Sequence, residues 1–548
     1  RLYSFSWRHV STRDVLVLWY AVTGSFLLIT ILVVSGQGVR AFAELPRSTL
    51  LVGFVLTFFF TGAMRMAKRI AQQISLGMGG GGKHVLIVGA GDAGEQLLRS
   101  MQTGQKKYVP VCLIDDDKKK QGISIHGVRV AGRVSDIPAV AKQYGVQEMI
   151  IAMPSAPSSV IKQAVELGRE AGIEAIKVLP SLGEIFDGKV SFSDVRDVQV
   201  HDLLGREVVS LDTDALSRFL RAKVVLITGA AGSIGSELAR QVSTFAPSTV
   251  VLLDQDESGI FMLAQELNER FSGIRIVSCV GNITDEQKIE RVFKQWQPHI
   301  VFHAAAYKHV PLMEADPAEA VHTNIWGTKI VSKAARLAGS ECFVYISTDK
   351  AVNPTSVMGA TKRVGEMICQ SSQEQGGTRF VAVRFGNVLD SRGNVVALFR
   401  EQIKRGGPVK ITDPEMKRYF MTNPEACLLV MQASAMGKGG EVFVLDMGSP
   451  VKIVDLAREM VRLSGLEPDR DIQFVFTGIR PGEKLFEEAL SAEEGTTVTQ
   501  HQKIFAAKLS LPDVALLEKG LQGLSEALSR SDAQSLVDTL HRLVPSYT

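Results

Sequence analysis

The sequence predicts an α/β protein in which a helical membrane hairpin precedes two nucleotide-binding-type units and a helical tail. Two long runs without charge open the chain, and two glycine-rich turns each lie between an apolar strand and a helix. From residue 83 onward, strands alternate with helices, which is typical of a parallel sheet covered by helices. A chain of 548 residues has room for about three structural units at roughly 150 residues each.

The composition argues against several classes of function. The net charge is +3, with 61 basic and 58 acidic residues interspersed, so no nucleic-acid partner is expected. The five cysteines lie far apart and form no CxxC pair, which argues against a zinc site or a disulfide framework. We therefore predict no metal site, and the cysteine usage fits a reducing cytosol.

Residues 1–70 are predicted to contain two transmembrane helices, at about 15–38 and 48–64. The charge-free run between Asp14 and Arg40 exceeds the roughly 20 residues that cross hydrocarbon, and the run between Arg47 and Arg65 is at the short end of that range. More basic residues flank the outer ends of these runs than occupy the connection between them. The positive-inside rule therefore places both ends in the cytoplasm, with the lipid bilayer as a partner.

A first Rossmann-like unit is predicted over residues 83–200, followed by a connector at 201–222. The strand in KHVLIVGAGDAGEQLL runs into Gly89, Gly91 and Gly94 and then a helix, and a second strand ends near Asp115. Such glycines can admit a phosphate to the helix N-terminus. No acid–base cluster accompanies them, so the sequence leaves open either a ligand site or a structural or regulatory role.

The second unit, residues 223–510, carries a stronger signal for dinucleotide binding. The stretch KVVLITGAAGSIGSELAR places Gly229, Gly232 and Gly235 between a strand and a helix. Asp254 ends the next strand, where a carboxylate binds a free ribose diol and repels a 2′-phosphate, which favours NAD over NADP. We therefore predict NAD as the cofactor. Further cofactor contacts are predicted at Ser233, Ile234, Asn282, Ile283, Ala304, Ala305 and Ala306.

The chemical site is predicted at the end of another buried strand, in CFVYISTDKAV. Thr348, Asp349 and Lys350 follow this strand, and the carboxyl ends of parallel strands face the ligand crevice. Met358 and Lys362 are four residues apart and share one helix face, where a short-chain dehydrogenase usually has Tyr-x-x-x-Lys. We expect Lys362 to hold the nicotinamide ribose. Met358 is expected either to pack on the substrate or cofactor or to be an ordinary packing residue.

Five stretches resemble the membrane-bound nucleotide-sugar 4,6-dehydratases of bacterial glycan synthesis, the WbpM/PglF type of the extended short-chain dehydrogenase/reductase family. They are STDKAVNPTSVMGATKR, TGAAGSIGSE, HAAAYKHVPLME, VRFGNVLDSRG and GIRPGEKLFEEAL. The resemblance covers nearly the whole chain and implies an extended short-chain dehydrogenase domain with a small substrate lobe. Methionine in place of the tyrosine is itself a feature of this family. The resemblance also implies a multi-pass protein of the bacterial inner membrane with cytoplasmic catalytic domains, and a further pair of membrane helices upstream of Arg1.

The same resemblance implies a reaction and roles for the predicted site. The substrate would be UDP-N-acetylglucosamine and the product UDP-2-acetamido-2,6-dideoxy-xylo-hexos-4-ulose. NAD would take a hydride from C4, water would leave from C6 after loss of the C5 proton, and the hydride would return to C6. Lys350 would be the C5 base, Asp349 the C6 acid, and Thr348 would bind the 4-hydroxyl. As a base, Lys350 would need a lowered pKa, and Asp349 would need a raised one.

Substrate contacts are expected at six further positions: Lys308, His309, Asn387, Arg418, Arg480 and Glu483. Lys308 and His309 could instead lie in a solvated loop, and Arg418 could be a salt-bridge residue rather than a nucleotide contact. Residues 511–548 are amphipathic at helical period and are predicted to pack against the body of the protein or a partner.

Three other functions remain open at this stage. A UDP-sugar 4-epimerase needs the same oxidation at C4 but neither a C5 base nor a C6 acid. A second kind of dehydratase also inverts C5, and a non-catalytic membrane scaffold could sense nucleotide sugars.

A homodimer through helices of the second unit is the expected assembly, with a higher homo-oligomer possible through the membrane hairpin.

Overall fold

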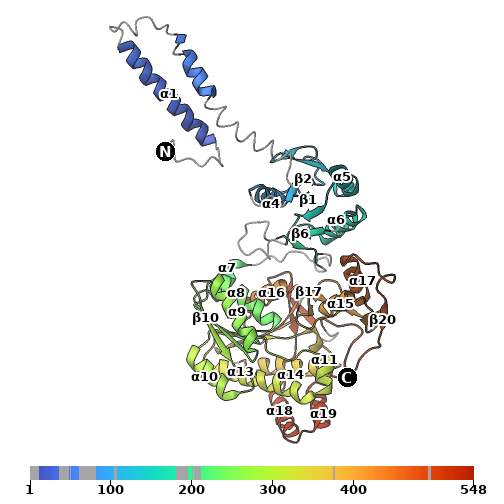
Figure 1. Cartoon of the computed structure of the whole chain (residues 1–548). Helices are drawn as coiled ribbons and strands as arrows, with labels where there is room; N and C mark the ends of the chain where they lie inside the picture. The colour runs from blue at the N-terminus through green and yellow to red at the C-terminus, as the bar shows by residue number, and fades with distance from the viewer. Residues whose placement is uncertain are drawn as a thin grey trace. The chain divides into compact units, whose positions relative to one another are not determined.

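The computed structural model describes residues 12–35, 48–49, 51–60, 82–103, 108–173, 175–180, 195–199, 202, 212–373, 377–389, 391–490 and 495–548. The chain divides into two compact units. One comprises residues 1–83 with 104–109, and the other comprises residues 84–103 with 110–548. Figure 1 colours the elements along the chain.

The described residues near the N-terminus are helical. Helix α1 spans Thr12–Ser35, and residues 48–49 and 51–60 are also in helix. No helix in the part of the chain that the structure describes reaches the length and apolarity that a membrane crossing requires. The predicted hairpin at about 15–38 and 48–64 is therefore not supported, and residues 36–38, 50 and 61–64 of it lie outside the described residues.

The first sheet has seven described strands in the order β3-β4-β2-β1-β5-β6-β7. Strand β1 pairs in parallel with β5, and β5 pairs in parallel with β6, so the predicted alternation of strands and helices is confirmed. The strands are β1 (Lys83–Val88), β2 (Tyr108–Ile114), β3 (Ser124–Ile125), β4 (Val128–Gly132), β5 (Glu148–Ile151), β6 (Ala175–Val178) and β7 (Arg196–Asp197). The helices are α4 (Asp92–Thr103), α5 (Ile137–Tyr144) and α6 (Ser158–Glu170).

The second sheet has nine described strands in the order β10-β9-β8-β11-β12-β13-β18-β22-β21. It is parallel from β10 to β18, and β22 and β21 extend it in antiparallel fashion. The strands are β8 (Val224–Thr228), β9 (Thr249–Asp254), β10 (Arg275–Val280), β11 (Ile300–His303), β12 (Cys342–Ile346), β13 (Arg379–Arg384), β18 (Val442–Leu445), β21 (Gly495–Val498) and β22 (Ile504–Lys508).

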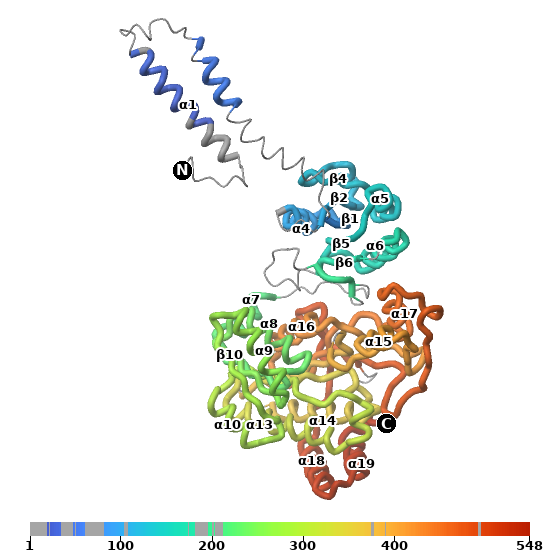
Figure 2. Tube along the Cα trace, viewed as in Figure 1, coloured from blue at the N-terminus to red at the C-terminus, as the bar shows by residue number. Residues whose placement is uncertain are grey.

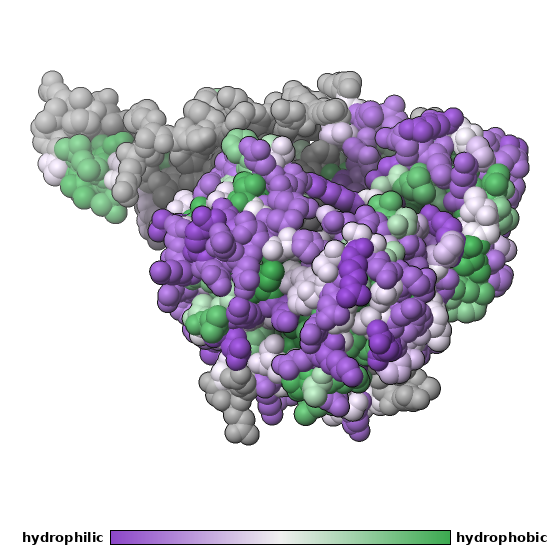
Figure 3. Space-filling model, turned by 90° about the horizontal axis from the view of Figure 1, so that it is seen from below, coloured by the Kyte–Doolittle hydropathy of each residue, from purple (hydrophilic) through white to green (hydrophobic). Residues whose placement is uncertain are grey.

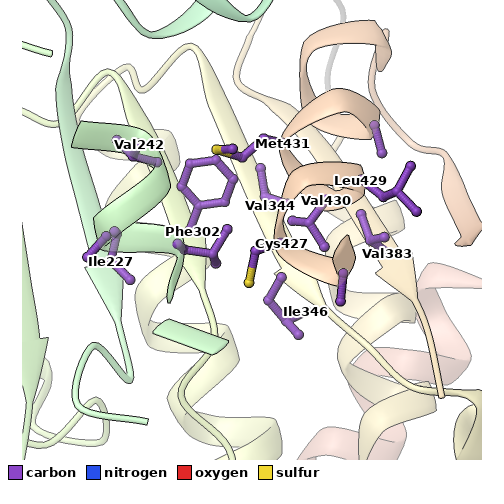
Figure 4. Close-up of a cluster of buried hydrophobic side chains, with 14 of the residues drawn as sticks. Ile227, Val242, Phe302, Val344, Ile346, Val383, Cys427, Leu429, Val430 and Met431 are labelled. Atoms are coloured by element: carbon purple, nitrogen blue, oxygen red, sulfur yellow. The ribbon is translucent and has the colours of Figure 1, made fainter. Parts of the chain in front are cut away.

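Successive residues of a strand point to opposite faces of the sheet, so both faces of the second sheet carry apolar side chains. Helices cover both faces. Phe302 of β11 packs into the cluster of α7, α8, α9 and α16, whereas its neighbour Val301 packs with α10, α13 and α14. Figure 4 shows Cys427, Val430 and Met431 of α16 against Val344 and Phe302 of the strands. The helices are α7 (Thr213–Leu220), α8 (Ser233–Thr244), α9 (Glu257–Arg270), α10 (Glu286–Trp296), α11 (Val310–Ala315), α12 (Pro317–Ala320), α13 (Thr328–Leu337), α14 (Val357–Ser371) and α16 (Asn423–Met436), with a π-helical stretch at Val321–Gly327.

A small lobe follows β13 and carries its own hydrophobic cluster. Its helices are α15 (Val395–Lys404) and α17 (Ile453–Leu463), and its strands pair as β14 (Asn387–Val388) with β17 (Phe420–Met421), β15 (Val409–Ile411) with β20 (Phe474–Phe476), and β16 (Lys417–Arg418) with β19 (Val451–Lys452). The resemblance implied a small lobe within residues 223–510, and the structure contains one. The predicted α/β fold of the dehydrogenase type is thus confirmed.

The C-terminal residues form two antiparallel helices, α18 (Val514–Ser529) and α19 (Ala533–Leu543), that pack against α14 (Figure 2). Leu517, Leu521 and Leu540 lie in one buried cluster with Val364 and Ile368 of α14. The prediction that this segment packs on the body of the protein is confirmed.

In the view of Figure 3 the surface is mostly hydrophilic, with apolar side chains in small patches.

Candidate active site

The turn after β8 has the close packing that the glycine spacing predicts. Gly229 has a φ of 68°, and a Cβ atom on it would lie 2.6 Å from the Ala305 backbone nitrogen. A Cβ on Gly235 would lie 2.1 Å from the Gly229 carbonyl oxygen. Neither position tolerates a side chain without a backbone shift. Gly232 is the N-cap of α8, so the turn delivers the chain to a helix N-terminus, where free amides and the helix dipole favour a phosphate.

Asp254 closes this turn from the end of β9. Its Oδ2 accepts a hydrogen bond from the Ala231 amide at 2.9 Å, and its Oδ1 accepts one from the Asp256 amide at 3.0 Å. A carboxylate oxygen can accept more than one hydrogen bond, so both oxygens keep capacity for a ribose diol. The glycine turn and Asp254 therefore fit the predicted NAD.

The other predicted cofactor residues surround the same turn but serve the fold in this structure. Ser233 Oγ accepts a hydrogen bond from the Arg392 amide at 2.9 Å, which joins the small lobe to the start of α8. Asn282 Oδ1 accepts one from the Thr284 amide at 2.9 Å, and so caps its own turn. The remaining residues pack tightly: Ile283 is buried, and Ile234, Ala304 and Ala305 are partly buried against the core. Ala306, next along the chain, is also partly buried.

Thr348, Asp349 and Lys350 lie together after β12. Thr348 is the N-cap of the 3-10 turn Asp349–Ala351, and its hydroxyl donates to Asp349 Oδ1 at 2.9 Å. The Lys350 Nζ donates to the same Oδ1 at 2.9 Å and to Asn387 Oδ1 at 3.1 Å. Asp349 is fully buried, and its Oδ2 has no hydrogen-bond partner among the described residues. The second oxygen of this buried carboxylate therefore keeps its capacity to accept a hydrogen bond or a proton.

Lys350 does not have the lowered pKa that a role as a base would need. Burial acts to lower the pKa of the amine, but the carboxylates of Asp349 and Glu487 together outweigh burial and raise that pKa above its usual value. Lys350 is therefore an ammonium ion near neutral pH. Any role as a base requires that it first release a proton.

Lys362 and Met358 occupy different surroundings although they share a helix. The Lys362 amine donates to the Ile346 carbonyl and lies 4.1 Å from the centroid of the Tyr345 ring. Burial lowers the pKa of Lys362 to about 7. Met358 is 2% exposed and packs in the cluster that α14 shares with α18 and α19. The packing alternative for Met358 is the one that this geometry supports.

A cavity of about 180 Å³ opens beside Lys350. Five of the six predicted substrate residues take part in its walls: Lys308, His309, Arg418, Arg480 and Glu483. The sixth, Asn387, binds Lys350 instead. Burial and the neighbouring Lys350 lower the pKa of Lys308, and burial and Lys308 lower the pKa of His309. Both residues line the cavity, but they lie in the irregular segment after β11 and are exposed, so the solvated-loop alternative stays open.

Arg418 shows mainly the structural alternative. Its guanidinium donates to the carbonyl oxygens of Lys417 at 2.8 Å, Leu485 at 3.2 Å and Lys484 at 2.7 Å. It also lies 3.6 Å from Glu487 Oε1. Arg418 therefore clamps the segment after Gly482 to β16 while it lines the cavity. Arg480 is more exposed and pairs with Glu483 at 2.5 Å.

Comparison with known proteins assigns the family. A model described as a polysaccharide biosynthesis protein matches residues 225–509, and one described as a CoA-binding domain matches residues 2–174. The chain is 43% identical over 513 residues to the capsular polysaccharide biosynthesis protein CapD of Staphylococcus aureus, covering 93% of this chain and 84% of that protein. The chain belongs to the polysaccharide biosynthesis protein family.

Two further relatives of this polysaccharide biosynthesis protein are named for the reactions that they catalyse. An inverting UDP-N-acetylglucosamine 4,6-dehydratase of Campylobacter jejuni is 31% identical over 298 residues, 53% of this chain and 84% of that enzyme. A UDP-glucose 4-epimerase of Rickettsia akari is 33% identical over 280 residues, 50% of this chain and 79% of that enzyme. The chain is thus of the nucleotide-sugar dehydratase and epimerase type, whose members are NAD-dependent, and the cofactor prediction is confirmed at that level.

Sequence reasoning missed several residues of the site in this polysaccharide biosynthesis protein. Glu487 lies in the cavity wall within a stretch, LFEEAL, whose pattern does not distinguish it from Glu488. Glu366 and Arg384 form a fully buried ion pair at 2.6 Å, and Ser347, just before the site, donates to Glu366 at 2.6 Å. The sequence signal for Glu366 and Arg384 was a charged residue within an apolar stretch. Their pairing could not be predicted, because it joins residues of two different elements.

Substituting Gly235 by alanine should impair NAD binding. The new Cβ would lie 2.1 Å from the Gly229 carbonyl oxygen, so the turn must open, and we expect NAD to bind at least about tenfold more weakly. Gly273→Ala is the control, because a Cβ there meets no described atom within 4 Å. Titration calorimetry with NAD measures the difference. Unchanged affinity in a folded Gly235→Ala variant would show that this turn is not the cofactor site.

Proposed function

We propose that the protein is a UDP-N-acetylglucosamine 4,6-dehydratase that supplies a UDP-4-keto-6-deoxy sugar for surface glycan synthesis. The observation that carries this proposal is the Asp349–Lys350 pair at the carboxyl end of β12, next to the cavity. Elimination of water across C5 and C6 requires a base at C5 and an acid at C6. A 4-epimerase requires neither of these two groups. The likeness to the Campylobacter jejuni dehydratase supports the same substrate.

The cavity walls and the glycine turn suit the two ligands. Lys308 and Arg480 supply positive charge for the diphosphate, and a forked guanidinium suits phosphate oxygens. Gly229, Gly235 and Asp254 would hold NAD, which supplies a hydride acceptor and donor when bound. The residues at the end of β12 are then left to move protons.

We assign the 4-hydroxyl proton to Asp349. The Thr348 hydroxyl donates its own hydrogen to Asp349 Oδ1, and its oxygen accepts a long hydrogen bond from the Lys350 amide at 3.4 Å, which leaves its second lone pair for the 4-hydroxyl of the hexose. The proton then passes from the 4-hydroxyl through Thr348 to Asp349. Asp349 later gives a proton to the 6-hydroxyl oxygen, which leaves as water. This route needs no side chain at position 358 that can accept a proton.

Lys350 is assigned to C5. Uptake of a proton by Asp349 removes one of the two negative charges that hold the proton on Lys350, so it lowers the pKa of the amine. Lys350 then releases its proton to solvent and accepts the proton of C5. After C6 has been reduced, Lys350 gives a proton back to C5 and then regains one from solvent, so the net change is loss of one water.

The assignment makes Met358 replaceable. Exchange of Met358 for leucine conserves volume and should cost less than about 1.5 kcal/mol of stability, with dehydratase turnover kept within a few-fold. Met367→Leu, on the same helix and in the same cluster, is the control. Thermal unfolding and a turnover assay measure the two effects. A folded Met358→Leu protein that has lost most of its turnover would contradict the assignment.

The function is tested by incubating the purified protein with NAD and UDP-N-acetylglucosamine and recording NMR spectra. We expect a 4-keto product with a new 6-methyl signal and loss of one water by mass spectrometry. Formation of UDP-N-acetylgalactosamine without water loss would instead establish the epimerase. In deuterated water the configuration at C5 of the product distinguishes a retaining dehydratase from an inverting one. Tightly bound nucleotide sugar without turnover would favour a scaffold.

The cellular location is proposed from the sequence. The charge-free runs and their flanking basic residues support a multi-pass protein of the bacterial inner membrane with cytoplasmic catalytic domains. Recovery of the native protein in the soluble fraction after cell lysis would contradict this location. A homodimer or higher homo-oligomer remains a prediction, and light scattering of the purified protein tests it.

A further inference from the structure

Glu487 is a buried carboxylate in the wall of the cavity beside Lys350. Its side chain is 4% exposed, and its Oε1 lies 3.6 Å from both the Lys350 amine and Arg418 Nε. Its Oε2 is buried and has no hydrogen-bond partner among the described residues. A buried carboxylate oxygen without a partner is costly, so its retention here calls for a role.

Arg418 does not need Glu487 to stay in place. Three backbone carbonyl oxygens already receive hydrogen bonds from its guanidinium. Lys350 has a different environment, because Asp349, Asn387 and Glu487 surround its amine on three sides. The stronger consequence of the Glu487 charge therefore falls on Lys350.

We propose that Glu487 is a positioning residue that sets the proton affinity of Lys350 and so decides when that amine can act as a base. The inference rests on the proposed function and deepens it. With Asp349 and Glu487 both negative, Lys350 keeps its proton. Once Asp349 has taken the 4-hydroxyl proton, Glu487 is the negative charge that remains beside the amine.

Other charged groups face the same space and set the background. Arg418 opposes protonation of Lys350, and the Lys308 amine lines the cavity with it. Four further titratable residues line the cavity: His309, Arg480, Glu483 and Lys484. Arg480 and Glu483 pair with each other, and the Lys484 amine donates to the Val352 carbonyl. The partners of these three charged groups in these contacts are therefore residues other than Lys350. Asp349 and Glu487 are therefore the two anions that dominate at the amine.

The test measures the proton affinity of Lys350 directly, without substrate. The whole protein is labelled with acetic anhydride across a pH series, and acetylation of Lys350 is quantified by peptide mass spectrometry. A carboxylate this close to an amine shifts its pKa by about one to three units, so Glu487→Gln should move the labelling midpoint to lower pH by about that amount. Glu488→Gln is the matched control, since Glu488 is the next residue, is exposed, and binds Asn353. That control should leave the midpoint unchanged.

A second measurement links this effect to turnover. The rate of solvent deuterium entry at C5 should rise with pH as Lys350 becomes neutral, and Glu487→Gln should move that rise to lower pH. If the midpoint of Lys350 labelling is the same in Glu487→Gln and in the unaltered protein, the inference is overturned and Glu487 only supports the Arg418 clamp. If Glu487→Gln fails to fold, Glu487→Asp replaces it, because the shorter side chain keeps the negative charge but moves it away from the Lys350 amine. A midpoint of Lys350 labelling equal to that of the unaltered protein then also overturns the inference. A protein that makes no 4-keto product would defeat the proposed function while leaving the labelling result intact.

Discussion

Asp349→Asn is expected to abolish almost all dehydratase turnover, with a loss of about 10²–10⁴-fold in kcat. Asparagine keeps the size of the side chain but cannot take a proton from Thr348 or hold one for the 6-hydroxyl. The buried Oδ2 has no described partner, so the substitution breaks no other hydrogen bond at that atom. Because oxidation at C4 needs the 4-hydroxyl proton to leave, rapid-quench mass spectrometry should find neither a 4-keto hexose nor water loss.

Lys350→Met separates the two proton transfers. This variant lacks the base for C5 but keeps the route through Thr348 to Asp349, so we expect a 4-keto hexose that has retained its 6-hydroxyl. Solvent deuterium should not enter C5. Lys333→Met is the control for loss of an ammonium group, since Lys333 is exposed and pairs with Glu286. Water loss at a normal rate in Lys350→Met would show that another group removes the C5 proton.

Arg384→Met is expected to destabilise the fold by about 3–5 kcal/mol, because it leaves Glu366 as a buried charge. Arg384 binds Glu366 through two hydrogen bonds, at 2.6 and 2.7 Å, and both residues are fully buried between β13 and α14. Urea-induced unfolding measures the change, and hydrogen exchange in β12, β13 and α14 locates it. Arg405→Met is the control, because the Arg405–Glu401 pair is exposed on α15 and should contribute at most about 1 kcal/mol.

The pH dependence of stability gives a second view of this buried pair. Burial alone would raise the pKa of Glu366, but Arg384, Arg363 and the Ser347 hydroxyl outweigh it and lower that pKa to about 2. A carboxyl with a lowered pKa in the fold stabilises the protein above its unfolded pKa of about 4.3, and this contribution is lost as pH falls toward 2. In Arg384→Met, a smaller loss of stability is expected over that interval. An unchanged acid profile would show that Arg384 does not control Glu366.

Several parts of the fold and the site follow from short stretches of sequence. The spacing of Gly229, Gly232 and Gly235 between a strand and a helix leads to the observed turn, because a Cβ on Gly232 or Gly235 would meet the Gly229 carbonyl oxygen. The sequence STDK after an apolar strand places Asp349 and Lys350 at the carboxyl end of β12, as predicted. Local sequence suffices for these features, whereas the close contact at Gly229 is with Ala305 of a distant segment.

Other parts could not be read from the sequence. A base role for Lys350 would need a lowered pKa, yet Glu487, which approaches the amine from a distant segment, helps to raise that pKa. Met358 shares a helix face with Lys362 by spacing, but the packing of α18 and α19 decides that it is a core residue. The sequence left Arg418 open between a nucleotide contact and a salt-bridge residue, and its hydrogen bonds to residues 484–485 depend on how that distant segment runs.

The amino-acid sequence by itself determined the order of strands and helices, the glycine turn and the acid–amine pair, because these depend on steric and periodic relations between near neighbours. The tertiary structure decided which charges face one another across the cavity and which side chains are removed from water. Electrostatic energies in a buried site depend on distances of a few ångströms between residues far apart in the chain, and such distances exist only once the chain has folded.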